Sequence, residues 1–205
     1  MSERCLIISG GEFSPFELPS PGEFVIACDR GYTYTRRCGI KPDLLVSDFD
    51  SYGGAVDELV PVRRLPTEKD DTDTMSALRY ALDHGYRELR LVCALGGRLD
   101  HLLANLQAAV FAAVRGAEVQ IESADTRILT LREGSLRLPR REGWSLSVFA
   151  ADGPCRGVSI EGAKYALREQ ELTPAFPLGV SNEWAADEAL ISVREGTLLV
   201  VLSKL

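Results

Sequence analysis

The chain has 205 residues, 45% of them hydrophobic and 26% charged, which is typical of a globular protein with one large domain or two small ones. Its net charge of −7 argues against nucleic acid as the main partner, because a phosphate backbone requires a basic face. No apolar run approaches the roughly 20 residues that span a bilayer, so we expect no membrane partner, and the N-terminus lacks a signal-peptide layout.

Short apolar runs alternate with helical patterns through the first 124 residues. The predicted strands are 4–10, 24–29, 44–50, 62–67, 89–95 and 117–123. Two segments between them carry apolar residues near the helical period of 3.6: Met75, Leu78 and Leu82 after Asp71, and Leu103, Leu106, Val110 and Ala113 after Asp100. Asp71 or Thr72 is expected to cap the first of these helices. Strands that alternate with helices predict a mostly parallel sheet covered on both faces.

The pattern changes near residue 125, where short segments begin to alternate apolar and polar residues with period two. The tripeptide Arg-Glu-Gly occurs at 132–134, 141–143 and 194–196, each time before a strand-like run. Each occurrence predicts a hairpin turn with glycine at a positive φ, and 189–205 reads as a terminal hairpin. The predicted fold is therefore α/β: a domain with a mostly parallel sheet at 1–124, followed by an antiparallel β domain at 125–205.

The cysteines carry no sign of a disulfide framework or a metal site. There are five, scattered and without a CxxC pair, and the chain has only two histidines. This pattern favours a reduced, cytoplasmic compartment and argues against zinc.

Four predicted strands end in polar residues. The second ends at Asp29 and Arg30, the third at Asp48 and Asp50, the fourth leads to Asp70, Asp71 and Asp73, and the fifth ends at Gly96, Gly97 and Arg98. The carboxyl ends of parallel strands share one rim, where open α/β sheets bind ligands. An aspartate after a strand is often only a turn residue or a helix cap, and for Asp29 alone that alternative has equal weight.

Asp48 and Asp50 are one residue apart at the end of an apolar strand. Their mutual repulsion is a cost unless a cation lies there. In an extended segment the two carboxylates point to the same side, so both can bind one hard cation. Mg²⁺ fits, since it takes a few carboxylates together with water and substrate phosphates. Capping does not readily explain all of Asp70, Asp71 and Asp73.

Gly96 and Gly97 follow an apolar strand and precede a predicted helix. Two glycines let the backbone approach a ligand, and a helix N-terminus attracts anions. Arg98 adds a guanidinium suited to phosphate. A glycine pair is also common in plain strand-to-helix turns, and no P-loop sequence occurs in the chain.

Taken in order, these motifs resemble those of the thiamin pyrophosphokinase family. The matching stretches are CDRGY, GIKPDLLVSDFDS, PTEKDDTDTMSAL, GGRLDHLLANL, GVSIEGAKYAL and GVSNEW, and they span most of the chain. The chain departs from the family pattern twice: Asp29-Arg30-Gly31-Tyr32-Thr33 replaces the usual Asp-Gly-Gly-Ala-Asn, and Ser47-Asp48 replaces Gly-Asp.

The resemblance implies a Mg²⁺-dependent transfer of the pyrophosphoryl group of ATP to thiamin, giving thiamin diphosphate and AMP. It also implies that the first domain, 1–124, binds ATP and that the second, 125–205, is a thiamin-binding β-sandwich. The family further implies a homodimer with its sites at the interface. The residues expected to hold Mg²⁺ are Asp48, Asp50 and Asp73, and the general base is expected to be Asp73 or Asp100. The residues expected to bind ATP are Asp29, Arg30, Lys69, Gly96, Gly97 and Arg98. Those expected to bind thiamin are Asp100, Ser181, Asn182 and Trp184.

Several alternatives stay open at this point. Trp184 is as well explained by packing in a β-domain core as by stacking on thiamin. Lys164 and Tyr165 match a family motif, but we interpret them as structural. The acid-rich rim would also serve a metal-dependent phosphohydrolase or a transferase with another acceptor, and a non-catalytic regulator that binds nucleotide or thiamin is a third possibility.

Overall fold

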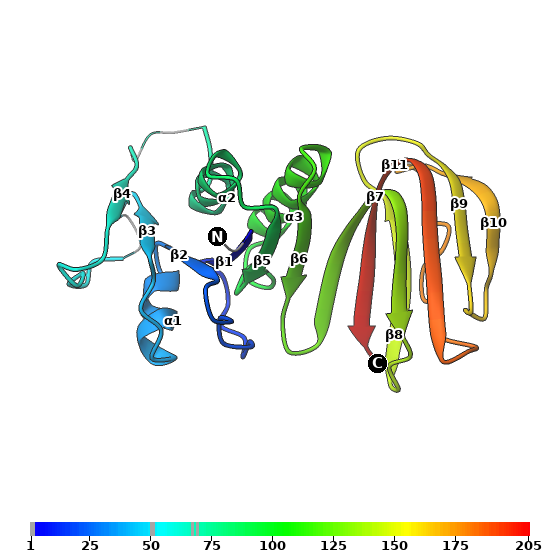
Figure 1. The fold of residues 1–205 in the computed structure, drawn as a ribbon, viewed down its shortest axis with the longest axis horizontal. Helices are drawn as coiled ribbons and strands as arrows, with labels where there is room; N and C mark the ends of the chain where they lie inside the picture. Colours follow the sequence, from blue (N-terminus) through cyan, green and yellow to red (C-terminus); the bar gives the residue numbers. More distant parts are fainter. Residues whose placement is uncertain (1–2, 50–51, 67, 69) are drawn as a thin grey trace. The chain divides into compact units, whose positions relative to one another are not determined.

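The computed structural model describes residues 3–49, 52–66, 68 and 70–205. Two predicted site residues, Asp50 and Lys69, lie outside the described residues. The chain forms two compact units, Met1–Ala124 and Asp125–Leu205 (Figure 1). No helix in the described part of the chain is long and apolar enough to cross a membrane.

The first unit is built on a sheet of six strands. These are β1 (Arg4–Ile8), β2 (Phe24–Cys28), β3 (Leu44–Ser47), β4 (Val62–Arg64), β5 (Glu88–Val92) and β6 (Glu118–Glu122). Their order is β6-β5-β1-β2-β3-β4, and every neighbouring pair is parallel. Cys5–Ile8 and Leu44–Ser47 are buried along their whole length, as expected for strands covered on both faces.

Three helices accompany this sheet: α1 (Gly31–Arg37), α2 (Asp73–Asp83) and α3 (Leu99–Val114). Figure 1 shows α1 on one face of the sheet and α2 and α3 on the other. The chain moves outward from β1 to β4, then returns through α2 to β5 on the other side of β1. The direction of winding therefore switches between β1 and β5, and ligands of open α/β sheets bind at such switch points.

The helix after Asp71 begins where the sequence predicts. Thr72 is the N-cap, and its hydroxyl accepts a hydrogen bond from the backbone N–H of Met75 at 3.1 Å. Of the two predicted caps, Thr72 is therefore the one that is confirmed. Asp71 instead forms an ion pair with Arg79 on the surface.

The helix after Arg98 differs from its predicted packing. It buries Asn105, Ala108, Ala109, Ala112 and Ala113, while Leu103 on the predicted apolar face is 51% exposed. Small alanine side chains let the helix backbone approach the sheet closely, so the alanine face is the one that packs. Of the predicted apolar residues, only Ala113 is buried.

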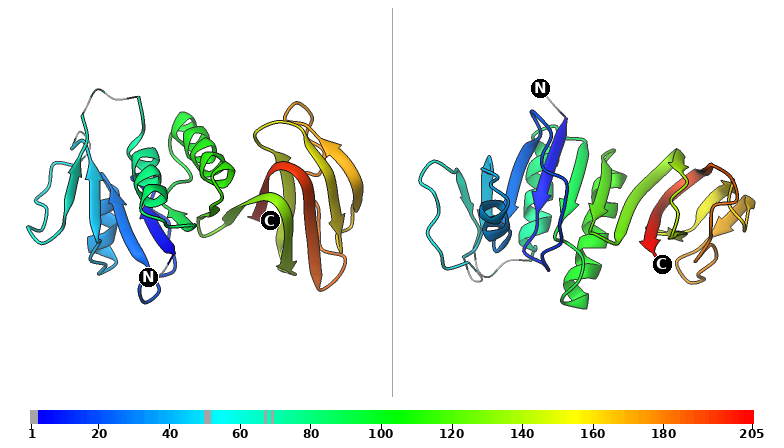
Figure 2. Two further views of the ribbon diagram at one scale, coloured as in Figure 1. Left: turned by 45° about the horizontal axis from the view of Figure 1, so that its top comes forward. Right: turned by 90° about the horizontal axis from the view of Figure 1, so that it is seen from below.

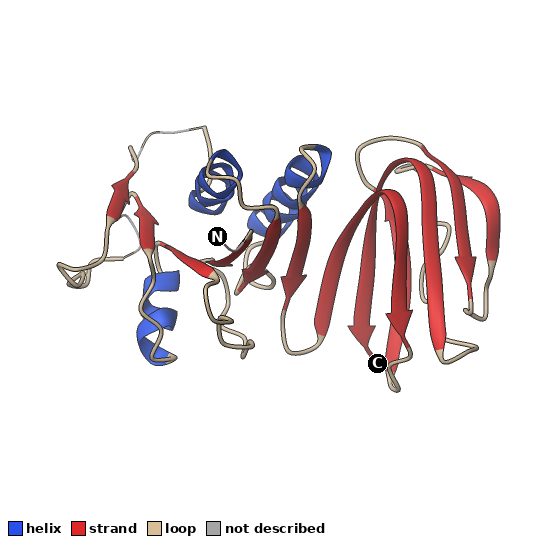
Figure 3. Cartoon of the chain, in the orientation of Figure 1, coloured by secondary structure: helices blue, strands red, loops and turns tan. Residues whose placement is uncertain are grey.

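The second unit is antiparallel. Its strands are β7 (Thr126–Pro139), β8 (Trp144–Ala150), β9 (Cys155–Glu161), β10 (Leu167–Leu172) and β11 (Glu188–Lys204). The long strand β11 pairs with β7 along one side, and with β9 and then β8 along the other. Figure 2 shows the long strands β7 and β11 side by side, and Figure 3 shows this unit as strands and loops.

Two of the three predicted Arg-Glu-Gly turns are wrong. Residues 132–134 and 194–196 lie inside β7 and β11, which continue through them, so the predicted terminal hairpin is one long strand. The pairing shifts register between Val193 and Thr197, where Glu133 and Gly196 adopt positive φ values of 45° and 96°. The glycine accommodates a bulge rather than a chain reversal. At 141–143 the turn forms as predicted, with Gly143 at φ 73°.

Candidate active site

A cleft of about 630 Å³ lies in the first unit, at the carboxyl ends of its central strands. Its walls come from the segments that follow β1, β2, β3 and β5 and from the start of α2. The cleft therefore includes the switch point of the sheet, and it draws on all four strand ends that the sequence marks as polar.

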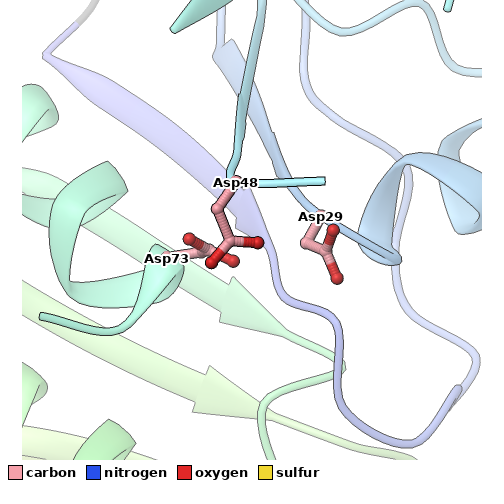
Figure 4. Close-up of side chains that lie close together, drawn as sticks. All are labelled: Asp29, Asp48 and Asp73. Atoms are coloured by element: carbon pink, nitrogen blue, oxygen red, sulfur yellow. The ribbon is translucent and has the colours of Figure 1, made fainter. Parts of the chain in front are cut away.

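Three aspartates converge in this cleft. Asp29 follows β2, Asp48 follows β3, and Asp73 is the first residue of α2. One carboxylate oxygen of each lies within 4.8 Å of the others (Figure 4). Asp29 is buried and the other two are half-buried. Clustered carboxylate oxygens are the donor set of a hard divalent cation, and this arrangement fits Mg²⁺.

The sequence placed Asp48 and Asp73 in a metal site but assigned Asp29 to the nucleotide. The geometry joins Asp29 to the other two, and the strand order explains why. Because β2 and β3 are paired in register from Ile26 and Leu44 onward, their ends bring Asp29 and Asp48 to neighbouring positions. A single sequence does not reveal which strands are neighbours.

A hydrogen-bond relay fixes Asp29. Its backbone N–H donates to the carbonyl of Val46 at 3.0 Å, and its Oδ1 accepts from the hydroxyl of Ser47 at 3.0 Å. The same hydroxyl accepts from the N–H of Phe49 at 2.9 Å. Asp29 and Phe49 both adopt positive φ, 46° and 65°, which is uncommon for residues other than glycine. Such strained conformations concentrate at functional sites.

The second departure from the family pattern, Ser47-Asp48 in place of Gly-Asp, therefore has a structural role. The hydroxyl of Ser47 orients the carboxylate of Asp29, which is one of the three in the cluster. The first departure is also accommodated. The guanidinium of Arg30 donates to the carbonyl of Gly11 at 2.8 Å, and the hydroxyl of Tyr32 accepts from the N–H of Asp57 at 3.0 Å. Arg30 is exposed and lines the cleft, so its guanidinium is available to a bound anion.

The start of α2 is also tied to the sheet. The side-chain hydroxyls of Ser9 and Thr74 are hydrogen-bonded at 2.9 Å, and both residues are buried. Since Ser9 follows β1 and Thr74 follows Asp73, this bond holds Asp73 above the end of the central strand.

The segment after β5 supplies the other wall. Gly96 and Gly97 are exposed in the cleft with φ values of 79° and 70°. Arg98 donates to Asp100 through two hydrogen bonds, of 3.1 Å and 2.5 Å. These bonds with Arg98 lower the pKa of Asp100. Arg98, a predicted phosphate ligand, and Asp100, a predicted general base, therefore neutralise each other's charge at the surface.

The predicted thiamin residues of the second unit have different environments. Ser181 is exposed, with φ 56°. Asn182 is 1% exposed, and its side chain bonds to the backbone of Tyr165 on both its oxygen and its nitrogen, at 2.9 Å and 2.7 Å. Trp184 is 8% exposed in the core of the unit, and its indole N–H donates to the carbonyl of Leu138 at 3.0 Å. Trp184 therefore packs in the core of the second unit, which is one of the two roles that the sequence left open for it.

Lys164 and Tyr165 support this same region. The backbone N–H of Lys164 donates to the carbonyl of Glu183 at 2.9 Å, and its ammonium group lies 3.3 Å from the Glu183 carboxylate. The segment that contains Asn182 is thereby held against the one that contains Lys164, which agrees with a structural role.

Sequence reasoning missed one carboxylate of the cleft, Glu12. It follows Gly10 and Gly11 after β1, and the glycine pair was the available signal. The glycine pair after β5 is the more conspicuous of the two in the sequence, because arginine and aspartate accompany it.

Known families and solved structures match this chain over most of its length. Residues 17–121 match the family described as thiamin pyrophosphokinase, catalytic domain, and residues 134–198 match thiamin pyrophosphokinase, vitamin B1 binding domain. A thiamine pyrophosphokinase of Bacillus subtilis is 24% identical over 184 residues, which cover 87% of this chain and 86% of that protein.

Solved structures share the fold over nearly the whole chain. The Bacillus subtilis thiamine pyrophosphokinase superposes with a TM-score of 0.84 at 22% identity, covering 98% of this chain and 99% of that one. A thiamin pyrophosphokinase family protein of Enterococcus faecalis gives 0.81 at 28% identity, with the same coverage. The enzyme of Candida albicans gives 0.73 at 12% identity, covering 99% of this chain and 90% of that one.

Proposed function

The chain belongs to the thiamin pyrophosphokinase family, and on that premise we propose how its cleft performs the family's reaction. The enzyme transfers the pyrophosphoryl group of ATP to the hydroxyethyl oxygen of thiamin. The thiamin oxygen forms a bond to the β-phosphorus, the bond between the β-phosphorus and its bridging oxygen to the α-phosphate breaks, and AMP leaves. The observation that carries this proposal is the carboxylate cluster of Asp29, Asp48 and Asp73 in the cleft.

These three carboxylates would hold the divalent metal that a kinase requires, and we propose that the metal is Mg²⁺. When bound, the ion neutralises charge on the phosphates and polarises the β-phosphorus. Phosphoryl-type transfer depends mainly on positioning and charge neutralisation, and needs little covalent work from the protein. The rigid support of Asp29 by Ser47 suits that requirement, since it fixes a ligand before the substrate arrives.

Phosphate oxygens would be bound from the opposite wall. Gly96 and Gly97 offer backbone N–H groups without side chains to block them, and Arg98 offers a guanidinium group beside them. Arg30, which follows Asp29 after β2, offers a second guanidinium group from the side of the aspartate cluster. Arg98 is 73% exposed in its pair with Asp100, so it can turn to an incoming phosphate at little cost. Lys69 is a further proposed phosphate ligand.

The proton of the thiamin hydroxyl passes, in this proposal, to Asp73 or to Asp100. General base catalysis of this kind contributes about 10²–10⁴-fold. Pairing with Arg98 lowers the pKa of Asp100, so in this pair Asp100 is a weaker base than a free aspartate. Asp73 is therefore the first of the two to test.

Thiamin would be recognised with the help of the second unit, which we propose to be a β-sandwich. Ser181 offers an exposed hydroxyl, while Asn182 and Trp184 would act by shaping this surface from within. We further propose a homodimer, on the family resemblance, and a cytoplasmic location, since all five cysteines are free thiols.

A product assay tests the reaction. Purified protein is incubated with thiamin, ATP and Mg²⁺, and AMP is resolved from ADP. Thiamin diphosphate formed in equal amount with AMP supports the proposal. ADP with thiamin monophosphate would contradict the pyrophosphoryl step, and turnover of ATP without thiamin would favour the phosphohydrolase.

Two variants and a control test the cluster in the same assay. Asp48→Asn and Asp73→Asn should each lower kcat/KM by at least about 10²-fold, because each removes one charge from the metal site. Asp71→Asn is the matched control, since Asp71 lies near Asp73 in sequence but pairs with Arg79 at 3.0 Å. Unchanged turnover in both cluster variants would contradict the metal assignment.

A further inference from the structure

Glu12 is a fourth carboxylate of the cleft, separate from the metal cluster. It lies in the loop after β1, and the three clustered aspartates come from other segments. It is exposed to the cleft, and its carboxylate has no hydrogen-bond or ion-pair partner among residues 3–49, 52–66, 68 and 70–205. A carboxylate accepts hydrogen bonds but donates none, so a ligand that satisfies Glu12 brings donors or positive charge.

The backbone of the loop brings this carboxylate next to the segment after β5. The N–H of Gly11 donates to the carbonyl of Cys93 at 3.0 Å, and a Cβ on Gly11 would stand 2.5 Å from that carbonyl oxygen. The loop after β1 is thus pressed against the segment after β5. A Cβ on Gly96 would in turn stand 2.6 Å from Oε2 of Glu12, so the carboxylate occupies the space that a side chain at Gly96 would fill.

This placement sets Glu12 across the switch point between β1 and β5. Its negative charge lies beside Gly96 but not Gly97, so a phosphate held by the N–H groups of the glycine pair would lie on the side of Gly97 and Arg98, away from Glu12. The part of a nucleotide that suits this end of the cleft is uncharged and rich in hydrogen-bond donors. In dinucleotide-binding sheets, an acidic side chain about 20 residues after the glycine-rich turn accepts hydrogen bonds from the ribose 2′-hydroxyl for the same reason.

We propose that Glu12 accepts hydrogen bonds from the ribose hydroxyls of the nucleotide and so selects ribonucleotides over deoxyribonucleotides. The inference rests on the proposed function, because it assigns the nucleotide to this cleft. It also gives Gly96 a second role, as the position that must lack a side chain for Glu12 to reach its place.

Steady-state kinetics with ATP, 2′-deoxy-ATP and 3′-deoxy-ATP tests the proposal. The wild-type enzyme should prefer ATP to at least one analogue by about ten- to a hundredfold in kcat/KM, the loss expected for one hydrogen bond to a charged group. Glu12→Ala should lower kcat/KM for ATP to the level of that analogue, and leave the value for the analogue unchanged. The KM for thiamin should not move.

The matched control is Glu17→Ala, an exposed carboxylate on the same loop outside the cleft, which should leave all three nucleotides unaffected. A Glu12→Ala enzyme that keeps the wild-type preference would overturn the inference. So would an equal loss for all three nucleotides, or a loss expressed in the KM for thiamin. Wild-type protein that makes no thiamin diphosphate from any nucleotide would instead overturn the proposed function, and the inference with it.

Discussion

Asp29 shows how one residue combines a strained backbone with a defined charge. Asparagine tolerates a positive φ and keeps an Oδ1 that can accept from Ser47, so Asp29→Asn preserves the local geometry and removes only the charge. We predict that this variant requires at least about tenfold more Mg²⁺ for half-maximal activity. Its melting temperature without metal should equal or exceed that of the wild type, because repulsion within the cluster is relieved.

The comparison variant is Asp29→Ala, which also removes the acceptor for Ser47. It should lose both activity and stability, the latter by about 1–3 kcal/mol, because a buried hydroxyl and a positive φ are left without support. A Mg²⁺ titration and a thermal melt of each variant separate the two effects. If Asp29→Asn titrates like the wild type, Asp29 is not a metal ligand.

At the scale of residues, the sequence predicted the class of reaction more completely than it predicted the residues that line the cleft. Asp48 and Asp73 stood out because their neighbours made an acid-rich pattern that capping did not explain. Asp29 and Glu12 each stand alone in the sequence, and only the pairing of β1 with β5 and of β2 with β3 brings them to the cleft. The supporting hydroxyl of Ser47 was visible only as a departure from a family motif.

At the scale of elements, the start of α1 depends on Gly31. Alanine is ordinarily the better helix former by about 1 kcal/mol. Here its Cβ would stand 2.1 Å from the carbonyl oxygen of Ile8, a backbone atom at the end of β1. We predict that Gly31→Ala destabilises the first unit by about 1–3 kcal/mol and lowers activity, because α1 must shift and Asp29 lies two residues before it.

Denaturant unfolding and the product assay measure both effects. Gly53→Ala is the control, because a Cβ there meets no atom within 4 Å and its φ is not positive. Equal stabilities for the two variants would show that α1 is not seated against β1 as described.

Two neighbouring strands carry buried thiols that titrate abnormally. Burial raises the pKa of Cys5 on β1 and of Cys28 on β2, and the nearby Asp73 raises the pKa of Cys28 further. Above the usual thiol pKa of about 9, the unfolded chain loses these protons while the folded chain keeps them. Unfolding then releases protons, so the free energy of unfolding falls as pH rises, by about 1.4 kcal/mol per pH unit for each thiol.

We therefore predict a stability loss of about 3 kcal/mol per pH unit above pH 9 from these two thiols together. Urea unfolding between pH 8 and pH 10.5 measures it. Cys28→Ala should remove about half of this slope, and Cys38→Ala, at a half-buried cysteine, is the control. A slope that is the same in all three proteins would show that other groups cause the alkaline loss.

Elements were predictable where one pattern dominates. The continuous apolar runs gave the parallel strands, and the helical period with Thr72 gave α2. The short helix α1 has no helical pattern in the sequence, because GYTYTRR combines glycine with β-branched and aromatic residues. The long strands β7 and β11 were divided at Arg-Glu-Gly, since a bulge and a turn use the same residues and only pairing across the strands distinguishes them.

At the scale of the whole molecule, the two units have separate hydrophobic cores, and a different spectroscopic signal reports on the folding of each. Among the described residues, every helix belongs to the first unit (Figure 3). Both tryptophans, Trp144 and Trp184, belong to the second unit and pack in or against its core. Circular dichroism at 222 nm therefore follows mainly the first unit, and tryptophan fluorescence follows the second.

We predict that a non-hydrolysable ATP analogue with Mg²⁺ stabilises the first unit alone. At a ligand concentration of about 100 Kd the gain is about 2.7 kcal/mol, which should raise the unfolding midpoint at 222 nm and leave the tryptophan midpoint in place. The same titration in Asp48→Asn, whose cluster lacks one charge, is the control and should show a much smaller shift. If both probes move together, the units unfold as one cooperative body, and nucleotide binding stabilises the second unit as strongly as the first.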